Sequence, residues 1–483
     1  MQLSDPSLLH HQSYIDGQWC DASTQKTFDV YNPATAELLA KVADCGHIEA
    51  EQAIHAANKS LPAWRALTSK QRASYLRKWF DLILANQQDL AMMMTLEQGK
   101  ALTEAKGEVS YGAFFVEWFA EEGKRQYGEV IPATNPNQKL MTIRQPIGVV
   151  AAITPWNFPI AMITRKAAPA LAAGCTMIIK PSEETPLCAL ALAELAHRAN
   201  IPAGVLNIVT GIDAKPIGKA LTESSIVRKL SFTGSTPVGK LLMSQCAQTV
   251  KRTSMELGGN APFIVFDDAD LDKAVEGALS SKYRNSGQTC VCANRILVHS
   301  AVYDEFAKKL TIAVEKTFKL GNGLDKGVTM GPLINQSAVN KVNQLVEQAL
   351  QSGAKVKLGG TPTEGLFYPP TVLTDVTPDM DIFNHEIFGP VAPLVRFETE
   401  DEAIELANST PFGLAAYFYA SDMGRIWRVS EGLEYGMVGI NEGLISNEVA
   451  PFGGVKESGV GREGSRHGID EYSEIKYLCM GVS

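Results

Sequence analysis

The sequence predicts an α/β protein built from two large lobes, and three observations support this. The chain has 483 residues, whereas one domain typically has about 100 to 200. From Gly148 to Ser235, short apolar runs alternate with helix-like stretches, which is typical of parallel βαβ units. A second series of strand-like and helix-like segments follows from Ala261 to about Asn441. We therefore expect two lobes that face one another across a cleft.

The elements of the first lobe can be predicted in chain order. Apolar side chains recur every three or four residues from Ser69 to Lys100, which predicts an amphipathic helix with Ser69 as its N-cap. Strands are expected at Val149 to Thr154, Thr176 to Lys180, Val205 to Thr210 and Lys229 to Phe232, and a helix at Leu187 to Asn200. Open parallel sheets bind ligands beyond the carboxyl ends of their strands. A nucleotide site is therefore expected at that edge.

The composition is that of a globular protein whose ligands are small molecules. Hydrophobic residues make up 45% and charged residues 20% of the chain, and the formal charge is -9, which argues against a nucleic acid or an anionic membrane as partner. No run of 18 or more apolar residues occurs, and no lysine or arginine precedes Lys26. Neither a membrane span nor a targeting peptide is therefore expected, and a cytoplasmic location follows by default.

The cysteines and histidines form no metal-binding pattern. The eight cysteines stand at positions 20, 45, 175, 188, 246, 290, 292 and 479, without the spacing of a disulfide framework or a zinc ribbon. The eight histidines are scattered apart from the His10-His11 pair. We therefore expect reduced cysteines and no metal.

Two segments carry the most informative chemical pattern. One is Met255-Glu256-Leu257-Gly258-Gly259-Asn260, and the other, whose first cysteine lies 34 positions after Glu256, is Gly287-Gln288-Thr289-Cys290-Val291-Cys292. Glycine and small polar residues are an unusual setting for a core thiol. Together with Tyr14-Ile15-Asp16-Gly17 and Pro451-Phe452-Gly453-Gly454, these segments resemble the aldehyde dehydrogenase superfamily over nearly the whole chain.

The resemblance implies an aldehyde dehydrogenase-like fold with three parts. A Rossmann-like NAD-binding domain would comprise residues 1–127 and 147–257, and an α/β catalytic domain residues 258–455. Residues 128–146 and 456–483 would form a small bridging sheet that pairs subunits. The implied assembly is a homodimer or a homotetramer.

Cys290, Glu256 and Asn157 are the candidate catalytic residues. Cys290 would attack an aldehyde as a thiolate, a form that an ordinary thiol with a pKa of about 8.5 adopts only slightly at neutral pH. By resemblance, Asn157 would donate to the thiohemiacetal oxyanion, and Glu256 would activate the water that hydrolyses the thioester left after hydride transfer. The structural alternatives are a buried apolar cysteine, an asparagine that caps the next helix, and an ordinary strand-end carboxylate.

The resemblance also implies a set of cofactor-binding residues, most of them at strand ends. They are Thr154, Pro155, Trp156, Lys180, Ser182, Glu183, Gly211, Thr233, Gly234, Ser235, Leu257, Glu386 and Phe388. The segment from Gly234 to Gly239 departs from the usual Gly-x-Gly-x-x-Gly fingerprint, but it opens a helix whose first amides suit a pyrophosphate. Glu183 would accept from two ribose hydroxyls and repel the extra phosphate of NADP, so NAD is favoured and NADP is the second choice. Alternatively, Glu183 and Glu184 form a solvated helix start.

Three further segments resemble the carboxylate-binding segments of succinate-semialdehyde dehydrogenases. They are Met162-Ile163-Thr164-Arg165, Tyr283-Arg284-Asn285 and Leu444-Ile445-Ser446, and Phe452 is a further substrate-binding candidate. Two arginines and a hydroxyl suit a carboxylate, so we expect succinate semialdehyde to be oxidised to succinate. Glutarate semialdehyde is the main rival, because one buried methylene contributes only about 0.8 kcal/mol. The structural alternative for both arginines is an exposed or salt-bridged side chain.

The same residues bear on two other functions and on one regulatory role. A non-catalytic nucleotide-binding protein would have no need of Cys290, Glu256 and Asn157 together. An acylating dehydrogenase, which passes the thioester to coenzyme A, would have little use for a water-activating Glu256. Cys292 is either a redox partner that forms a reversible disulfide with Cys290 or a small residue of the pocket wall.

Overall fold

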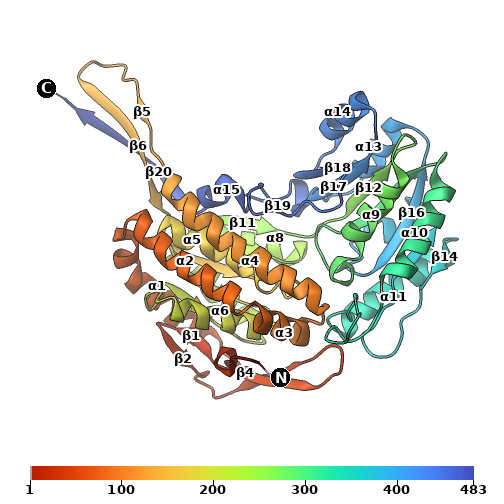
Figure 1. The fold of residues 1–483 in the computed structure, drawn as a ribbon. Helices are drawn as coiled ribbons and strands as arrows, with labels where there is room; N and C mark the ends of the chain where they lie inside the picture. Colours follow the sequence, from red (N-terminus) through yellow and green to blue (C-terminus); the bar gives the residue numbers. More distant parts are fainter. Residues whose placement is uncertain (1–2, 483) are drawn as a thin grey trace.

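The computed structural model describes residues 3–482 and contains two α/β lobes and a projecting arm (Figure 1). Both lobes are built on mostly parallel sheets, as the alternation of apolar runs predicts. The first lobe holds most of the first 260 residues, and the second holds the chain from there to about residue 440. The α/β fold class predicted from the sequence is confirmed.

The first lobe is organised around an eight-stranded sheet. Its order is β19 (Gly459–Val460), β11 (Arg252–Glu256), β10 (Val227–Thr233), β7 (Val149–Ile153), β8 (Thr176–Lys180), β9 (Leu206–Ile208), β1 (Ser13–Ile15) and β2 (Gln18–Cys20). Strands β11 to β9 run parallel, whereas the outer strands run antiparallel. A separate hairpin of β3 (Thr27–Tyr31) and β4 (Leu38–Ala43) lies near the amino terminus.

Successive residues of the central strands point into two different cores, because side chains alternate across a sheet. In β7, Val150 and Ala152 belong to one core, and Val149 and Ala151 to the other. The first core is covered by α2 (Ser69–Ala85), α3 (Gln87–Gln98), α4 (Leu102–Glu122), α5 (Ala161–Ala173) and α6 (Pro186–Arg198). The second is covered mainly by α1 (His47–Ala66), α7 (Ala214–Glu223) and α8 (Thr236–Cys246). Covering both faces leaves the strand ends as the free edge.

The second lobe repeats this plan around a seven-stranded sheet. Its order is β14 (Lys355–Leu358), β15 (Thr371–Thr374), β16 (Val391–Phe397), β13 (Ala293–His299), β12 (Ala261–Val265), β17 (Ala415–Tyr419) and β18 (Met437–Ile440). Helices α9 (Leu271–Lys282) and α10 (Tyr303–Thr317) cover one face. The other carries α11 (Gln336–Gln351), α12 (Asp381–Asn384), α13 (Glu400–Asn408) and α14 (Met423–Gly432).

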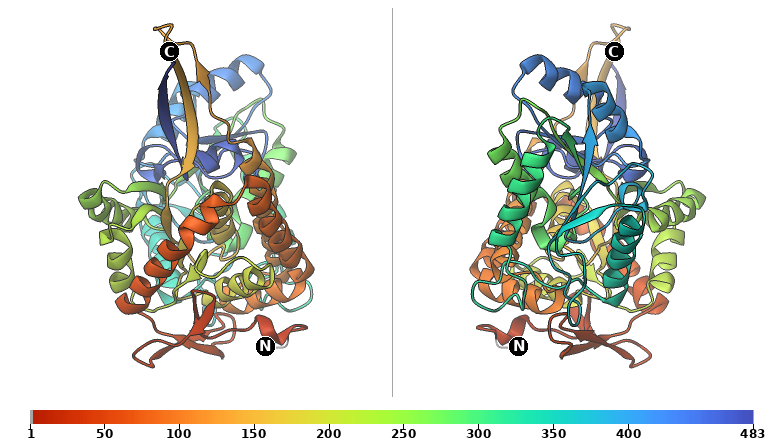
Figure 2. Two further views of the ribbon diagram at one scale, coloured as in Figure 1. Left: turned by 90° about the vertical axis from the view of Figure 1, so that its left-hand side faces the viewer. Right: turned by 90° about the vertical axis from the view of Figure 1, so that its right-hand side faces the viewer.

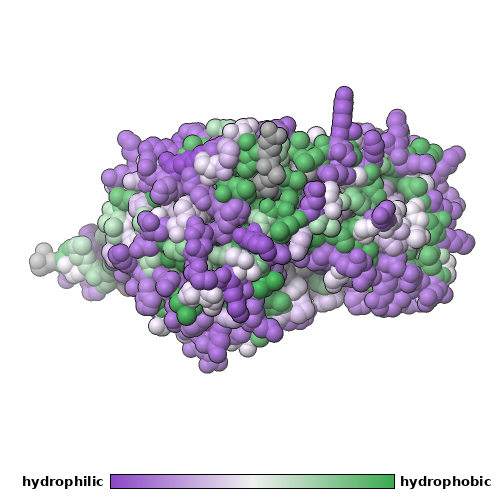
Figure 3. Space-filling view, turned by 90° about the horizontal axis from the view of Figure 1, so that it is seen from below, coloured by the Kyte–Doolittle hydropathy of each residue, from purple (hydrophilic) through white to green (hydrophobic). Residues whose placement is uncertain are grey.

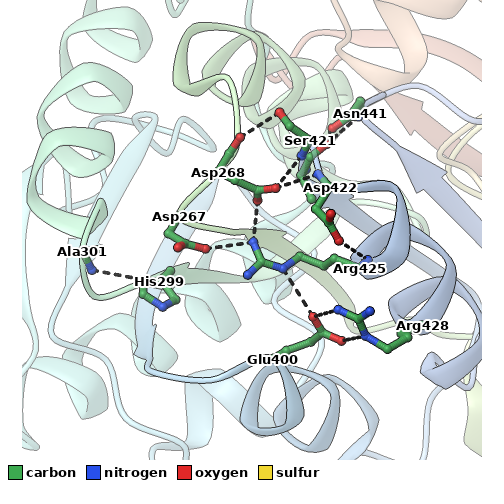
Figure 4. A network of polar contacts seen from close by, with 11 residues as sticks. Asp267, Asp268, His299, Ala301, Glu400, Ser421, Asp422, Arg425, Arg428 and Asn441 are labelled. Atoms are coloured by element: carbon green, nitrogen blue, oxygen red, sulfur yellow. Dashed lines mark hydrogen bonds and ion pairs between the residues drawn. The ribbon is translucent and has the colours of Figure 1, made fainter.

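A network around Arg425 fastens α14 to the loop after β12. Its guanidinium contacts Asp267 at 2.8 Å, Asp268 at 2.5 Å and Glu400 at 3.3 Å, and Glu400 also binds Arg428 (Figure 4). Charge-assisted bonds of this kind orient the groups that they join. The network lies on the outer side of the lobe and serves the scaffold.

The arm is a three-stranded sheet of β20 (Ser473–Gly481), β6 (Gln138–Pro146) and β5 (Val130–Ile131). It extends away from both lobes, at the end opposite the amino terminus (Figure 2). Ile475, Tyr477 and Met480 on β20 are more than half exposed. The chain from α15 (Ser465–Asp470) leads into β20, whereas β19 joins the eight-stranded sheet, so the described part of the predicted bridging segment, residues 456–482, contributes to both sheets.

The structure corrects one predicted element of the scaffold. Residues 69–100 form two helices, α2 and α3, which meet at Asn86. Asn86 leaves helical geometry at ψ 18°, and its side-chain amide donates to the carbonyl of Leu82 over 2.8 Å. Such a local bond competes with the helix. The N-cap of α2 is Thr68, not Ser69.

The outer surface is mixed in character. Seen from below, apolar residues gather near the middle of the face and hydrophilic residues surround them (Figure 3).

Among residues 3–482, none of the helices is both long and apolar enough to cross a membrane. Within the same range, no group of three or more His, Cys, Asp or Glu residues is arranged to hold a metal ion.

Candidate active site

The loop that carries Cys290 has an unusual backbone. Asn285, Ser286 and Gly287 all adopt the left-handed region, at φ 52°, 55° and 74°. Non-glycine residues in that region are strained and recur at functional sites. A Cβ on Gly287 would lie 2.1 Å from the carbonyl oxygen of Gly389, so only glycine allows this approach.

The predicted base segment and the predicted thiol segment are in direct contact. A Cβ on Gly259 would lie 2.2 Å from the carbonyl oxygen of Cys290. Glycine therefore lets the strand-end segment of the first lobe pack against the thiol loop of the second. The two motifs that are 34 residues apart in sequence belong to one site.

A cavity of 260 Å³ joins many of the predicted residues between the lobes. Its lining includes Pro155, Trp156, Asn157, Thr233, Gly234, Ser235, Leu257, Cys290, Glu386 and Phe388. Cys290 is only partly buried and faces this space. The cavity thus brings the thiol together with residues that were predicted to bind the cofactor.

Asn157 is held in a defined orientation beside the thiol loop. Its Nδ2 donates to the carbonyl oxygen of Gln288 over 3.0 Å. An amide nitrogen carries two hydrogens, so the second hydrogen is free for a ligand in the cavity. The first amides of α5 are bound by Glu108 instead, at 3.0 Å for Ile160 and 3.3 Å for Ala161. The structure therefore does not support the alternative in which Asn157 caps that helix.

Glu256 is a buried carboxylate that lacks partners. It ends β11 with 2% exposure, and neither of its oxygens has a hydrogen-bond partner among the described residues. Burial, followed by repulsion from Glu463, raises its pKa to about 8. A carboxylate with such a pKa is suited to exchange protons near neutral pH.

Nearby groups act on the pKa of the Cys290 thiol in opposite directions. Burial raises its pKa to about 12, the nearby charge of Arg165 acts in the lowering direction, and that of Glu256 raises the pKa further. The resting thiol is therefore protonated, and its reaction requires a base to take the proton. Cys292, two residues on, is buried, and its sulfur donates to the carbonyl of Lys282 over 3.5 Å.

Sequence reasoning missed a buried ionic group behind Glu256. Glu463 accepts from the guanidinium of Arg165 and from the ammonium of Lys166, and all three side chains are 5% exposed or less. These two cations hold the pKa of Glu463 below its ordinary value. Two adjacent cations within the otherwise mostly apolar α5 were the available signal in the sequence.

Arg165 packs against an aromatic ring, and Arg284 lines a cavity. The Arg165 guanidinium stacks 4.1 Å from the centre of the Phe452 ring, and its Nη2 has no partner within residues 3–482. Arg284 lines a cavity of 320 Å³ whose other walls include Tyr111, Phe158 and Ser446.

The Tyr111 phenol lies in the wall of the same cavity as Arg284. Its oxygen is buried and lacks a partner in the described chain. Burial raises the pKa of this phenol, whereas the charges of Arg165 and Arg284 act in the lowering direction. Tyr111 was not among the residues predicted from the sequence.

The remaining predicted cofactor residues occupy two places. Glu386 accepts from the amide of Gly259 over 3.0 Å, and Phe388 meets Trp156 edge to face at 5.6 Å, both at the thiol cavity. Lys180 pairs with Glu183 at 2.8 Å, near a separate cavity of 770 Å³ that Glu183 also lines. Thr154, Ser182 and Gly211 do not line the thiol cavity.

These features fit a dinucleotide that lies across the strand ends. The buried Thr233 hydroxyl has no partner inside the described region, and Ser235 precedes the first turn of α8, whose amides face outward from the sheet edge. The chain belongs to the aldehyde dehydrogenase family, whose family model matches residues 19–478.

Individual relatives agree over the full length of the chain. It is 62% identical to the glutarate-semialdehyde dehydrogenase of Pseudomonas putida strain KT2440, with 100% of each chain covered. It is 60% identical to the NADP+-dependent succinate-semialdehyde dehydrogenase of Escherichia coli K12, again with 100% of each covered. A crystal structure of an NADP-dependent enzyme from Escherichia coli matches with a TM-score of 0.99 at 60% identity and 100% coverage of both chains.

Proposed function

We propose that this aldehyde dehydrogenase oxidises succinate semialdehyde to succinate. The observation that carries the proposal is the set of donors at the positions predicted to bind a carboxylate. Among the described residues, Nη2 of Arg165 has no partner, and Arg284 and Ser446 line one cavity. A carboxylate bound by such donors would direct the aldehyde at the other end of a short chain toward the thiol.

The catalytic residues act in sequence on that aldehyde. Glu256, the unpartnered carboxylate, takes the proton of Cys290, whose sulfur then attacks the carbonyl carbon. The free N–H of Asn157 and the backbone N–H of Cys290 stabilise the resulting oxyanion. A bound nicotinamide cofactor supplies the hydride acceptor. Glu256 releases the thiol proton to solvent, and the recovered carboxylate then takes a proton from the water that hydrolyses the thioester on Cys290.

NAD is the proposed cofactor, with NADP as the alternative. Glu183 would accept from the hydroxyls of the adenosine ribose and repel a 2′-phosphate. However, its charge is partly balanced by Lys180 at 2.8 Å, which weakens that repulsion. The two cofactors should be compared directly, by kcat/KM in the wild type and in Glu183→Ala, for which relative use of NADP should rise.

Glutarate semialdehyde is the second candidate, favoured by one of the full-length relatives. Initial rates with succinate semialdehyde, glutarate semialdehyde and butanal test both. A large preference for an acid over butanal supports the arginine pair, and the ratio between the two acids identifies the chain length. Equal rates with butanal would overturn the proposed role of the arginines and leave the dehydrogenase chemistry in place.

We also propose that the arm pairs subunits and that Cys292 protects Cys290 through a reversible disulfide. The exposed apolar residues of β20 support the first proposal, and light scattering of a chain truncated after Tyr472 tests it. For the second, inactivation by peroxide should be reversed by dithiothreitol in the wild type but not in Cys292→Ala.

A further inference from the structure

We propose that Lys100 and Glu108 are positioning residues that hold Asn157 in its working orientation. The inference rests on the proposed role of Asn157 as an oxyanion donor. Lys100 lies between α3 and α4, and Glu108 lies on α4, so neither belongs to the strand-end motifs. Their paired side chains are each 1% exposed. Burying two charges is costly unless both are well bonded, and here their bonds converge on one turn.

Residues of both lobes hold the backbone of Lys100 in place. Gly99 ends α3 at φ 95°, and a Cβ there would lie 2.8 Å from Pro332. A Cβ on Gly323 would lie 2.5 Å from the carbonyl oxygen of Lys100. The loops of the second lobe therefore pack tightly around the backbone of Lys100, and its side chain points inward.

The Lys100 ammonium makes three contacts at the turn that carries Asn157. It donates to the carbonyl oxygen of Asn157 over 2.8 Å and to the Glu108 carboxylate. It also lies 4.1 Å from the centre of the Phe158 ring. A cation that binds a carbonyl and the following aromatic face restrains the peptide between them.

Glu108 holds the other end of the same turn. Its second oxygen accepts from the amides of Ile160 and Ala161, at 3.0 and 3.3 Å. These amides open α5 and would otherwise lack partners. The ion pair therefore bridges the carbonyl of residue 157 and the start of the helix, so that the turn between them is held at both ends.

Restraint of this turn determines the direction of the free side-chain N–H of Asn157. The side-chain amide is already fixed by the carbonyl of Gln288, so the backbone position decides where the remaining N–H points. Oxyanion donors act only when aimed at the developing charge, and a misplacement of about 1 Å can cost about a hundredfold in rate. Loss of the Lys100 ammonium should therefore slow the step in which the oxyanion forms and collapses.

The test compares hydride transfer with a reaction of the same thiol that develops no oxyanion. Lys100→Met, Asn157→Ala and the double variant are assayed by the pre-steady-state burst of NADH or NADPH with succinate semialdehyde, using whichever cofactor is turned over faster. Alkylation of Cys290 by iodoacetamide is measured in parallel. Lys100→Met should slow the burst by ~10- to 100-fold, leave alkylation within about twofold, and add less than about twofold to the loss in Asn157→Ala.

A matched control and a second variant keep the result interpretable. Lys229 is another buried lysine, paired with Glu471 at 3.2 Å outside the site, so Lys229→Met should lower Tm yet leave the burst rate unchanged. If Lys100→Met is insoluble, Glu108→Gln should show the same coupling to Asn157 with a smaller loss.

Two results would overturn the inference, and they differ in what else they overturn. A wild-type burst in Lys100→Met, or a fully multiplicative loss in the double variant, would refute the positioning role alone. An unchanged burst in Asn157→Ala would refute the oxyanion role itself, and this inference with it.

Discussion

Two buried charge clusters, one formed by Lys100 and Glu108 and the other by Arg165, Lys166 and Glu463, are built in opposite ways. The Lys100–Glu108 pair lies in the wall of the 320 Å³ cavity, but its charged groups are already bonded to a carbonyl, an aromatic ring and the first amides of α5. In the cluster of Arg165, Lys166 and Glu463, the ions are paired with each other, but Nη2 of Arg165 and both oxygens of Glu256 lack partners among the described residues.

This difference separates groups that stay fixed from groups that react. A network whose charged groups are all bonded within the protein gains little from a ligand, so we infer that it holds neighbouring groups in position. Buried polar atoms without partners are costly, and they persist where substrate, water or a proton completes them. The predictions below test this division by removing one group at a time.

The largest expected effect comes from removing the thiol of Cys290. Cys290→Ala should lower dehydrogenase turnover by at least ~10⁴-fold, because covalent catalysis is lost. The readout is steady-state NADH or NADPH formation. Cys292→Ala is the matched control and should retain near wild-type turnover. Comparable losses in the two variants would mean that the nucleophile has been misassigned.

Glu256→Gln should separate the two halves of the reaction. Loss of the base should slow thioester hydrolysis by ~10² to 10⁴-fold. The burst should also be slower, because Glu256 takes the thiol proton, and the acyl-enzyme that does form should accumulate, detectable by mass spectrometry of the intact protein. Asn157→Ala should slow only the burst. An acyl-enzyme that accumulates in neither variant would contradict this division of labour.

Arg284→Met tests whether the arginine that lines the 320 Å³ cavity binds the substrate carboxylate. The KM for succinate semialdehyde should rise by ~10- to 100-fold, the size of a lost charge-assisted hydrogen bond. The kcat/KM for butanal should stay within about twofold, because that aldehyde has no carboxylate. Arg396→Met, which removes an exposed arginine paired with Asp304 at 2.6 Å, is the control. Equal losses for both aldehydes in Arg284→Met would point to structural damage instead.

The sequence predicts the fold and the reactive residues, but it does not predict the buried charged groups that hold those residues in place. The alternation of apolar runs predicts the parallel strands, and Glu256 and Cys290 lie in compact motifs. Lys100 and Asn157 are 57 positions apart, and Arg165 and Glu463 are 298 apart. Such pairs are created only by tertiary packing of segments far apart in the chain, and no local period records them. The division of residues 69–100 was missed for the opposite reason, because one side-chain bond at Asn86 overrides a continuous helical pattern.

The smallest expected effect is a shift in pH dependence when Glu463 loses its charge. Hydrolysis requires the ionised form of Glu256, so its rate should rise with pH through the pKa of about 8. Glu463 raises that pKa, whereas Arg165 and Lys166 act to lower it. In Glu463→Gln the repulsion is gone and the two cations are less neutralised, so both changes favour the carboxylate and the profile should move to lower pH.

The size of that effect follows from ionisation alone. At pH 7 a group with a pKa of about 8 is roughly one-tenth ionised, so hydrolysis at this pH can increase at most about tenfold. The measurement is the single-turnover rate of acyl-enzyme hydrolysis between pH 6 and 10, with Glu471→Gln as the control, because Glu471 is a carboxylate bound to a different buried lysine. A profile that stays in place, or moves to higher pH, would mean that Glu463 only supports Arg165. The cluster of Arg165, Lys166 and Glu463 would then only hold other groups in position, as the Lys100–Glu108 pair does.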